Sequence, residues 1–172
     1  MGCDIHAFVE LVSKEDQTRV SSIAEFNLGR DYRLFTVLAG VRVSEQLLFP
    51  EPKGIPKSLG WQTGDKYYMV VVPDNEPGEE ENTVKRSSAE EYVKDGFSTW
   101  EDPKNQWRIS SPDWHTPSYL NTKELEDAIQ VYGPANAGLE GTREIRGVLS
   151  LMKTLDQDNK KTEARFVFWF DN

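Results

Sequence analysis

Two short motifs hold both histidines of the chain, Asp4-Ile5-His6 and Asp113-Trp114-His115. In each, a carboxylate lies two residues before an imidazole, and on a strand both side chains would point to one face, about 6.6 Å apart. Such a pair can share a metal ion, orient the ring for proton transfer, or present a donor and an acceptor to a ligand. We expect His6 and His115 to line one common cavity. The plain alternative is a buried histidine bonded to a local carboxylate or to the backbone.

The end of the chain supplies a further acid for this cluster. If the first and last strands pair antiparallel, Asp171 comes to lie beside Asp4 and His6. In the alternative, the terminal Asp-Asn pair only solvates a strand end. The predicted cluster consists of Asp4, His6, Asp113, His115 and Asp171.

Arg30 and Arg33 are spaced to share one face of a predicted helix. Arg30 would lie close to the start of that helix, where backbone N–H groups already favour a phosphate. The alternative is a solvated helix face whose arginines pair with nearby acids. Both arginines are therefore candidate ligand-binding residues.

Aromatic side chains are concentrated in the segments without clear periodicity, where they can stack a nucleobase or close loops onto the core. They are Trp61, Tyr67, Trp100, Trp107, Trp114 and Tyr119. The sequence contains no Gly-x-Gly-x-x-Gly, P-loop, nucleophile elbow or His-Glu-x-x-His motif. We therefore expect no metal and no cofactor. Cys3 is expected to be a small buried hydrophobe rather than a nucleophile.

Hydrophobic patterning predicts a single α+β domain over residues 1–172. We expect a mixed or antiparallel sheet with adjacent N- and C-terminal strands, and three to four helices. The strands are predicted over residues 4–12, 20–26, 67–72 and 164–170. The helices are predicted over 30–43 with Asn27 as N-cap, over 88–96 opened by a Ser88–Glu91 capping box, over 121–132 capped by Asn121, and over 142–155.

The remaining segments are predicted to be loops. Residues 47–64 form a long loop with a basic PKGIPKS stretch, and residues 100–117 are irregular because they hold three prolines. Residues 73–83 contain Pro, Gly and three consecutive Glu, which predicts a mobile acidic loop.

Composition narrows the classes of partner. The 172 residues carry 20 Lys and Arg against 29 Asp and Glu, a net charge of −9, so a general nucleic-acid binder is excluded. A small anion held in a local basic pocket remains compatible. No apolar run approaches the length of a membrane span, and the chain opens directly in a strand pattern, so we expect no membrane segment and no signal peptide. A single cysteine fits a protein of a reducing cytoplasm. The sequence is also compatible with a homo-oligomer.

Several blocks of the sequence resemble a family of small bacteriophage and prophage proteins. The blocks are the opening MGCDIHAFVE, the RDYRLFTVLAGVR helix, the KGIP loop, the DWHTPSYLNTKEL segment and the terminal VFWFDN. They cover about a third of the chain and both of its ends. The family motif positions fall on Cys3, Asp4, His6, Arg30, Tyr32, Phe35, Gly54, Pro56, Asp113, His115, Ser118, Asp171 and Asn172.

The resemblance implies a phage gene product that acts in the host bacterial cytoplasm, and it adds Ser118 to the candidate ligand-binding residues. This chain departs from the family's Asp-Gly-His-Ser-His-Ser-Trp motif at Pro117 and Tyr119. A mechanism that needs a His-x-His pair would fail here, which lowers the case for a metal site or a two-motif phosphoesterase.

Three functions follow from these residues. The first is a phage accessory protein that binds and sequesters a nucleotide-derived small molecule, such as a host-defence signal. The second is a hydrolase or phosphodiesterase with His6 and His115 as acid and base, oriented by Asp4 and Asp113. The third is an acidic inhibitor of another protein. The first is favoured because the chain has only two histidines and no nucleophile or metal signature.

Overall fold

The computed structural model describes residues 2–41, 49–76, 82–132 and 140–171. These residues form an α+β fold with five helices and two four-stranded sheets, as the patterning predicted. Five helices are one more than the expected range, because a short helix forms at the end of the segment read as a loop. The predicted acidic loop has its centre, residues 77–81, outside the described residues.

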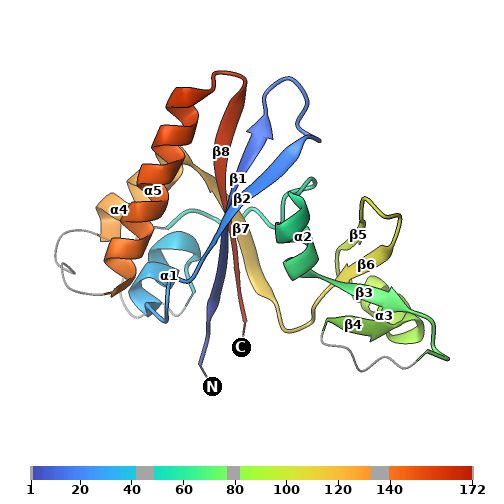
Figure 1. Cartoon of the computed structure of the whole chain (residues 1–172). Coiled ribbons are helices and arrows are strands. Elements are labelled where there is room, and N and C mark those ends of the chain that lie inside the picture. Colours follow the sequence, from blue (N-terminus) through green and yellow to red (C-terminus); the bar gives the residue numbers. More distant parts are fainter. Residues whose placement is uncertain (1, 42–48, 77–81, 133–139, 172) are drawn as a thin grey trace.

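Sheet A is antiparallel and has the strand order β2-β1-β8-β7. It is built from β1 (Ile5–Ser13), β2 (Val20–Phe26), β7 (His115–Asn121) and β8 (Thr162–Phe170). Ile5 pairs with Phe170 and Ser13 with Thr162, so β1 and β8 are neighbours along their whole length. The predicted pairing of the terminal strands is confirmed, and it brings the two ends of the chain together (Figure 1).

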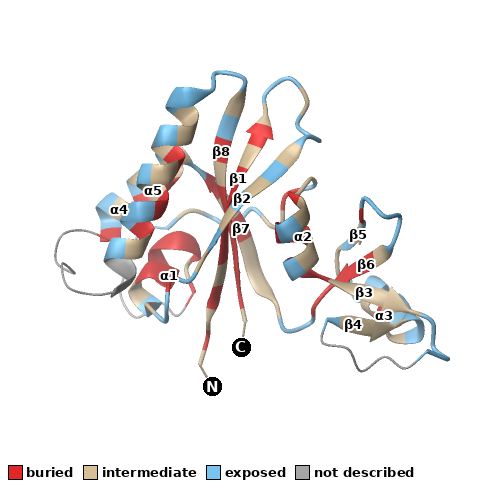
Figure 2. Ribbon diagram, viewed as in Figure 1, coloured by how far each residue is buried: buried red, intermediate tan, exposed pale blue. Residues whose placement is uncertain are grey.

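One face of sheet A is covered by three helices (Figure 1): α1 (Tyr32–Ala39), α4 (Thr122–Tyr132) and α5 (Glu140–Asp158). Alternate residues of the two central strands point to these helices. From β1 these are Ile5, Ala7 and Val9, and from β8 they are Phe166, Phe168 and Phe170. All are buried, and they make the interface between sheet and helices the main core (Figure 2).

The other face of sheet A carries a smaller aromatic core of Phe8, Tyr67, Tyr68, Val167 and Trp169. Beyond it lie α2 (Trp61–Tyr67) and sheet B, whose order is β4-β3-β6-β5. Sheet B consists of β3 (Tyr68–Val72), β4 (Thr83–Lys85), β5 (Thr99–Glu101) and β6 (Trp107–Ser110), and α3 (Arg86–Lys94) packs on it. Both faces of the second half of β8 are therefore buried, which explains its unbroken apolar run from Phe166 to Phe170.

The sequence predicted N-caps for three helices, and in two of them the structure has a different N-terminus. Asp31, not Asn27, caps α1 by accepting from the N–H groups of Arg33 and Leu34. Helix α3 begins at Arg86, before the expected capping box, because the Asp74 carboxylate accepts from the backbone and hydroxyl of Ser87.

The cap predicted for α4 is confirmed. Asn121 Oδ1 accepts from Glu124 N–H while Glu124 accepts from Asn121 N–H, each at 2.9 Å. This reciprocal pair is a capping box in which asparagine takes the place of Ser or Thr.

The segment 100–117 is not irregular. Its prolines lie between strands β5, β6 and β7 or, for Pro117, at a bulge in β7, where the register shifts and Thr116 has a φ of 48°. Proline lacks an N–H donor, so it is confined to such positions within a sheet. The prolines therefore marked the ends of short strands rather than the absence of strands.

Candidate functional site

Asp171 joins the two ends of the chain to His6. Its Oδ2 lies 3.0 Å from His6 Nε2, and its Oδ1 accepts from Asp4 N–H at 2.8 Å. Because a carboxylate accepts only, Nε2 of His6 carries the proton and donates it to Asp171. The side chains are 20% and 25% exposed, so the dyad is half-buried but open to small molecules.

Two tryptophans hold the imidazole of His6 in place. Trp169 stacks on it at 5.5 Å between ring centroids, and Trp114 tilts against it at 4.8 Å. Trp114 is itself fixed, since its Nε1 donates to Tyr67 O at 2.9 Å. No described residue hydrogen-bonds Nδ1 of His6, so this atom is left as an acceptor in a ring whose position is set by its neighbours.

His6 lies where two hollows meet, between sheet A and α2. One has a volume of about 920 Å³ and reaches Asp113 and Trp114, and the other has about 580 Å³ and reaches Asp4. Both are lined by His6, Glu25 and Lys66. We call the two together the His6 cleft. Each volume lies in the range of small-molecule sites.

Helix α2 forms the wall opposite His6, and its glycines let it approach closely. Gly60 N–H donates to the buried Glu10 carboxylate at 2.7 Å, and the Ser22 and Thr63 hydroxyls bond at 2.9 Å. A Cβ at Gly60 would collide with the Ser22 backbone, and one at Gly64 would collide with the Trp100 ring. A helix with a central glycine persists here because tertiary contacts outweigh its low propensity.

Asp4, one of the acids that line the cleft, is paired with an arginine beside it. Arg30 binds the Asp4 carboxylate through Nε and Nη2, the latter at 2.7 Å. Hydrogen bonding to Arg30 lowers the pKa of Asp4, and the same pair raises the pKa of Arg30. The charge of Arg30 is thus already neutralised, and its predicted role as a phosphate ligand is not favoured by this geometry.

A buried arginine holds helix α2, the wall opposite His6, against sheet B. Arg108 is 4% exposed and pairs with Asp102 at 2.8 Å and with Asp65 at 2.9 Å. Its guanidinium lies over the rings of Trp61 and Trp100, at 5.2 and 5.9 Å. These contacts tie α2, which supplies Trp61 and Asp65 to the cleft, to strands β5 and β6.

Three charged side chains of the cleft are unpaired among the described residues. Glu25, Lys66 and Asp113 line it, and their side chains form no ion pair or hydrogen bond with the described residues. With Asp4 and Asp65 paired to arginines, the groups left to meet a ligand are two carboxylates, one ammonium and the imidazole. The cleft is therefore mildly acidic and suits a ligand with few negative charges.

His115 does not share this cleft, so the expectation of a common cavity is wrong. His115 pairs with Phe170 and stacks on its ring, whereas His6 pairs with Trp169, the next residue of β8. Successive residues of a strand face opposite sides. His115 therefore lies on the helix-covered face, with its Nε2 3.8 Å from Cys3 Sγ.

Of the remaining predicted site residues, some lie at the His6 cleft and others lie away from it. Asp113 lines the cleft, but Ser118 is buried and accepts from Lys53 N–H at 3.1 Å, which anchors a loop. Arg33 lies on α1 and does not line the cleft. The structure thus brings together Asp4, His6, Arg30, Asp113 and Asp171, and it separates Arg33, His115 and Ser118 from them.

The sequence reasoning missed Glu25 and Lys66. Glu25 pairs with Phe8 in the β1–β2 ladder, and Phe8 shares a face with His6. The register of the predicted hairpin was a signal that could have found it. Lys66 had no such signal, because it falls between the predicted loop 47–64 and the predicted strand 67–72 and was assigned to neither.

Searches among known proteins add no identification: no protein family, curated protein or solved structure matches the chain. Within the described ranges, no three His, Cys, Asp or Glu side chains are placed to hold a metal ion. None of the described helices is both long enough and apolar enough to cross a membrane.

Proposed function

We propose that the His6 cleft binds a nucleotide-derived small molecule and holds it without chemical change. The observation that carries this proposal is that aromatic surface and unpaired polar groups line the same hollow, the larger of the two in the cleft, with a volume of about 920 Å³. Aromatic rings stack bases of any kind, and a few placed polar groups then select among them.

The contacts of the proposed ligand follow from the lining groups. The flat base lies against Trp114 or Trp61, within reach of His6. Asp113 and Glu25 accept hydrogen bonds only, so they favour a base with N–H donors on its edge, as in adenine or guanine. Nδ1 of His6 accepts one further hydrogen bond from a base or a sugar hydroxyl.

The charges of the cleft limit the phosphates of the ligand. Lys66 lines both hollows and has no acidic partner among the described residues, whereas Arg30 is paired with Asp4. We infer a ligand with one or two phosphate charges, at least one of them near Lys66. A linear polyphosphate would meet Glu25 and Asp113 without enough cations to compensate it.

The biological role we propose rests on the resemblance to phage proteins. A small phage protein in the host cytoplasm that captures a nucleotide-derived signal would lower the free concentration of that signal. The capture requires stoichiometric protein and no catalysis. This is the counter-defence role expected from the sequence.

The experiment is a binding panel measured by calorimetry. The panel contains nucleosides, cyclic mononucleotides, cyclic oligonucleotides and cyclic ADP-ribose isomers. The expected result is saturable binding of one compound, weakened about tenfold by Asp113→Asn, which removes a charged acceptor worth about 1.4 kcal/mol or more. Asp127→Asn, on the exposed surface of α4, is the matched control and leaves the affinity unchanged.

Release after heating distinguishes capture from turnover. A captured compound is recovered chemically intact by chromatography, in an amount equal to the protein. Multiple turnovers would reject capture. Binding of none of these compounds would reject the ligand class and favour the inhibitor of another protein.

The His6–Asp171 dyad supports a second candidate, an acid–base hydrolase or phosphodiesterase. A carboxylate fixes the tautomer of His6 and leaves Nδ1 as a base beside the cleft. The version with two histidines is excluded by the position of His115, so His6 would act with one dyad alone. Substoichiometric protein would then consume excess ligand, and His6→Ala would abolish consumption while binding persists.

A further inference from the structure

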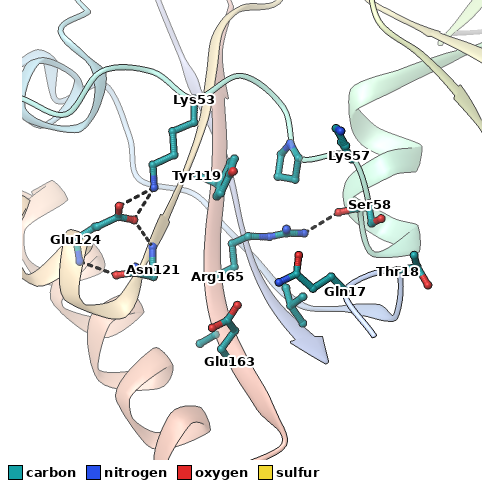
Figure 3. Close-up of a pocket in the computed structure, with 13 residues that line it drawn as sticks. Gln17, Thr18, Lys53, Lys57, Ser58, Tyr119, Asn121, Glu124, Glu163 and Arg165 are labelled. Carbon is teal, nitrogen blue, oxygen red and sulfur yellow. Dashed lines mark hydrogen bonds and ion pairs between the residues drawn. The ribbon is translucent and has the colours of Figure 1, made fainter. Parts of the chain in front are cut away.

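A second polar hollow lies at the opposite end of the same face of sheet A. It has a volume of about 550 Å³ and is lined by the hairpin turn after β1, the loop that carries Lys53 and Lys57, and strands β7 and β8 (Figure 3). Arg165 of β8 points into it, and Val167 and Trp169 continue the same face toward His6. We call it the Arg165 pocket.

We propose that the Arg165 pocket binds a small monoanion, a carboxylate or a singly charged phosphate ester. The proposal is independent of the ligand of the His6 cleft. It rests on three cations that line the pocket, two of which, Arg165 and Lys53, lie over the ring of Tyr119.

Arg165 is the fixed donor of this pocket. Its Nε and Nη2 donate to the Glu10 carboxylate at 3.2 and 2.6 Å, and Nη2 also donates to Ser58 O at 2.7 Å. Glu10 is fully buried and Arg165 is 14% exposed, so this fork cannot swing away. The third nitrogen, Nη1, donates to no described residue. A guanidinium held by two of its nitrogens is prepared to receive an anion on the third.

Two lysines complete the cationic wall (Figure 3). Lys53 binds both oxygens of Glu124 at 2.7 Å and lies 4.9 Å from the centre of the Tyr119 ring, and Arg165 lies 5.6 Å from that centre. Lys57 lines the pocket and has no acidic partner in the described part of the chain. It is exposed and free to close on a ligand that Arg165 already holds.

The charge balance limits the ligand to one negative charge. Arg165 is balanced by Glu10, and Lys53 by Glu124. This leaves Lys57 as the uncompensated cation and Glu163, also unpaired among the described residues, as the uncompensated acid. The pocket is thus nearly neutral although the chain carries a net charge of −9. A single anionic group fits the donors, whereas a polyanion would be repelled by Glu163 and Glu124.

The test uses three probes at about pH 6, where inorganic phosphate is mainly a monoanion: acetate, benzoate and inorganic phosphate. Binding is followed by NMR chemical shifts in full-length protein, with chloride replaced at constant ionic strength. We expect saturable shifts at Arg165, Tyr119 and Lys57 for at least one probe. Acetate and phosphate separate the two sources of the anion, and benzoate shows whether a ring that can stack on Tyr119 adds to the binding of a carboxylate.

Four variants, one of them a control, make the test specific. Lys57→Gln should weaken binding about two- to fivefold and Lys57→Arg should restore it, as expected for an exposed ion pair. Glu163→Gln should strengthen binding by a similar factor, because it removes a like charge. Lys94→Gln, in the exposed last turn of α3 and away from both pockets, is the matched control and should change nothing.

Equal shifts with chloride, or equal binding by all four variants, would overturn the proposal. Stronger binding of a polyphosphate than of the monoanions would overturn the charge argument. Neither outcome depends on whether the His6 cleft binds a nucleotide.

Discussion

The same three-residue pattern, Asp-x-His, has opposite fates on β1 and β7, the two strands that flank β8 in sheet A. His6 faces the cleft, donates to Asp171 and stacks on Trp169, whereas His115 packs on Phe170 beneath the helices. The difference arises because their partners in β8 are consecutive residues, which a strand turns to opposite faces. A motif therefore identifies a candidate group, but the strand register decides whether that group meets a ligand or the core.

The largest effect is expected on the His115 side. Phe170→Ala should lower the free energy of unfolding by about 3–5 kcal/mol, because Phe170 is fully buried against Phe35, Phe168 and His115. Urea denaturation measures the loss, and Phe170→Leu should lose less than half as much. A loss below 1 kcal/mol for the alanine variant would mean that this face is not the main core.

The stability contributed by Asp102, which pairs with Arg108 behind α2, should be lost in acid. Burial raises the pKa of Asp102, but hydrogen bonds from the Gln106 backbone, Arg108 and the Lys104 backbone outweigh burial and hold it below the usual 3.8. A group with a depressed pKa stabilises the fold above its unfolded pKa, and this contribution is lost as the pH falls through the folded value.

Asp102→Asn should therefore cost about 2–3 kcal/mol at pH 7. It should also remove part of the loss of stability that the parent protein shows below about pH 4. Urea denaturation at pH 7, 4 and 3 measures both effects. Parallel pH profiles of the variant and the parent would contradict the assignment.

Exchanging each histidine for alanine tests the comparison directly. His115→Ala should cost about 1–2 kcal/mol of stability and leave ligand affinity unchanged, because among the described residues its ring contacts Cys3, Phe170 and Thr116 rather than the cleft. His6→Ala should cost less than about 1 kcal/mol and weaken the ligand about tenfold. The reverse result would place the binding site on the helix-covered face.

The smallest effect is expected at Arg30. Its ion pair with Asp4 is exposed, and exposed pairs contribute little to stability. Arg30→Gln should leave the urea midpoint unchanged and alter ligand affinity less than threefold, since Asp4 already neutralises the guanidinium. A loss of tenfold or more would restore Arg30 to the role of phosphate ligand.

Part of the site was accessible to sequence reasoning. Strand periodicity at both ends of the chain implied their pairing, and from that pairing Asp171 could be placed beside His6. Asp113 was found through its motif. Glu25 was accessible through the hairpin register, because it pairs with Phe8 on the face of His6.

The sequence did not predict the elements that form the wall of the cleft opposite His6. Helix α2 contains Gly64 and shows no regular spacing of apolar residues. It forms because Gly60 at its start donates to Glu10 and because Gly64 lets the ring of Trp100 pack closely. Strands β5 and β6 are three and four residues long, too short for a period to stand out among prolines. These elements depend on contacts between segments far apart in the chain.

The sequence by itself determined the α+β class and indicated that the terminal strands are adjacent, since period-two and helical patterns of apolar residues can be read locally. The position of Asp171 beside His6 followed from that adjacency. Only the tertiary structure decided which face each histidine occupies, which arginines keep an available charge, and that a second sheet closes the cleft. A shift of one residue in strand pairing reverses every side chain, and the sequence of a single strand does not fix that choice. The pairing of Arg30, Arg108 and Arg165 with distant carboxylates likewise follows from the folded chain alone.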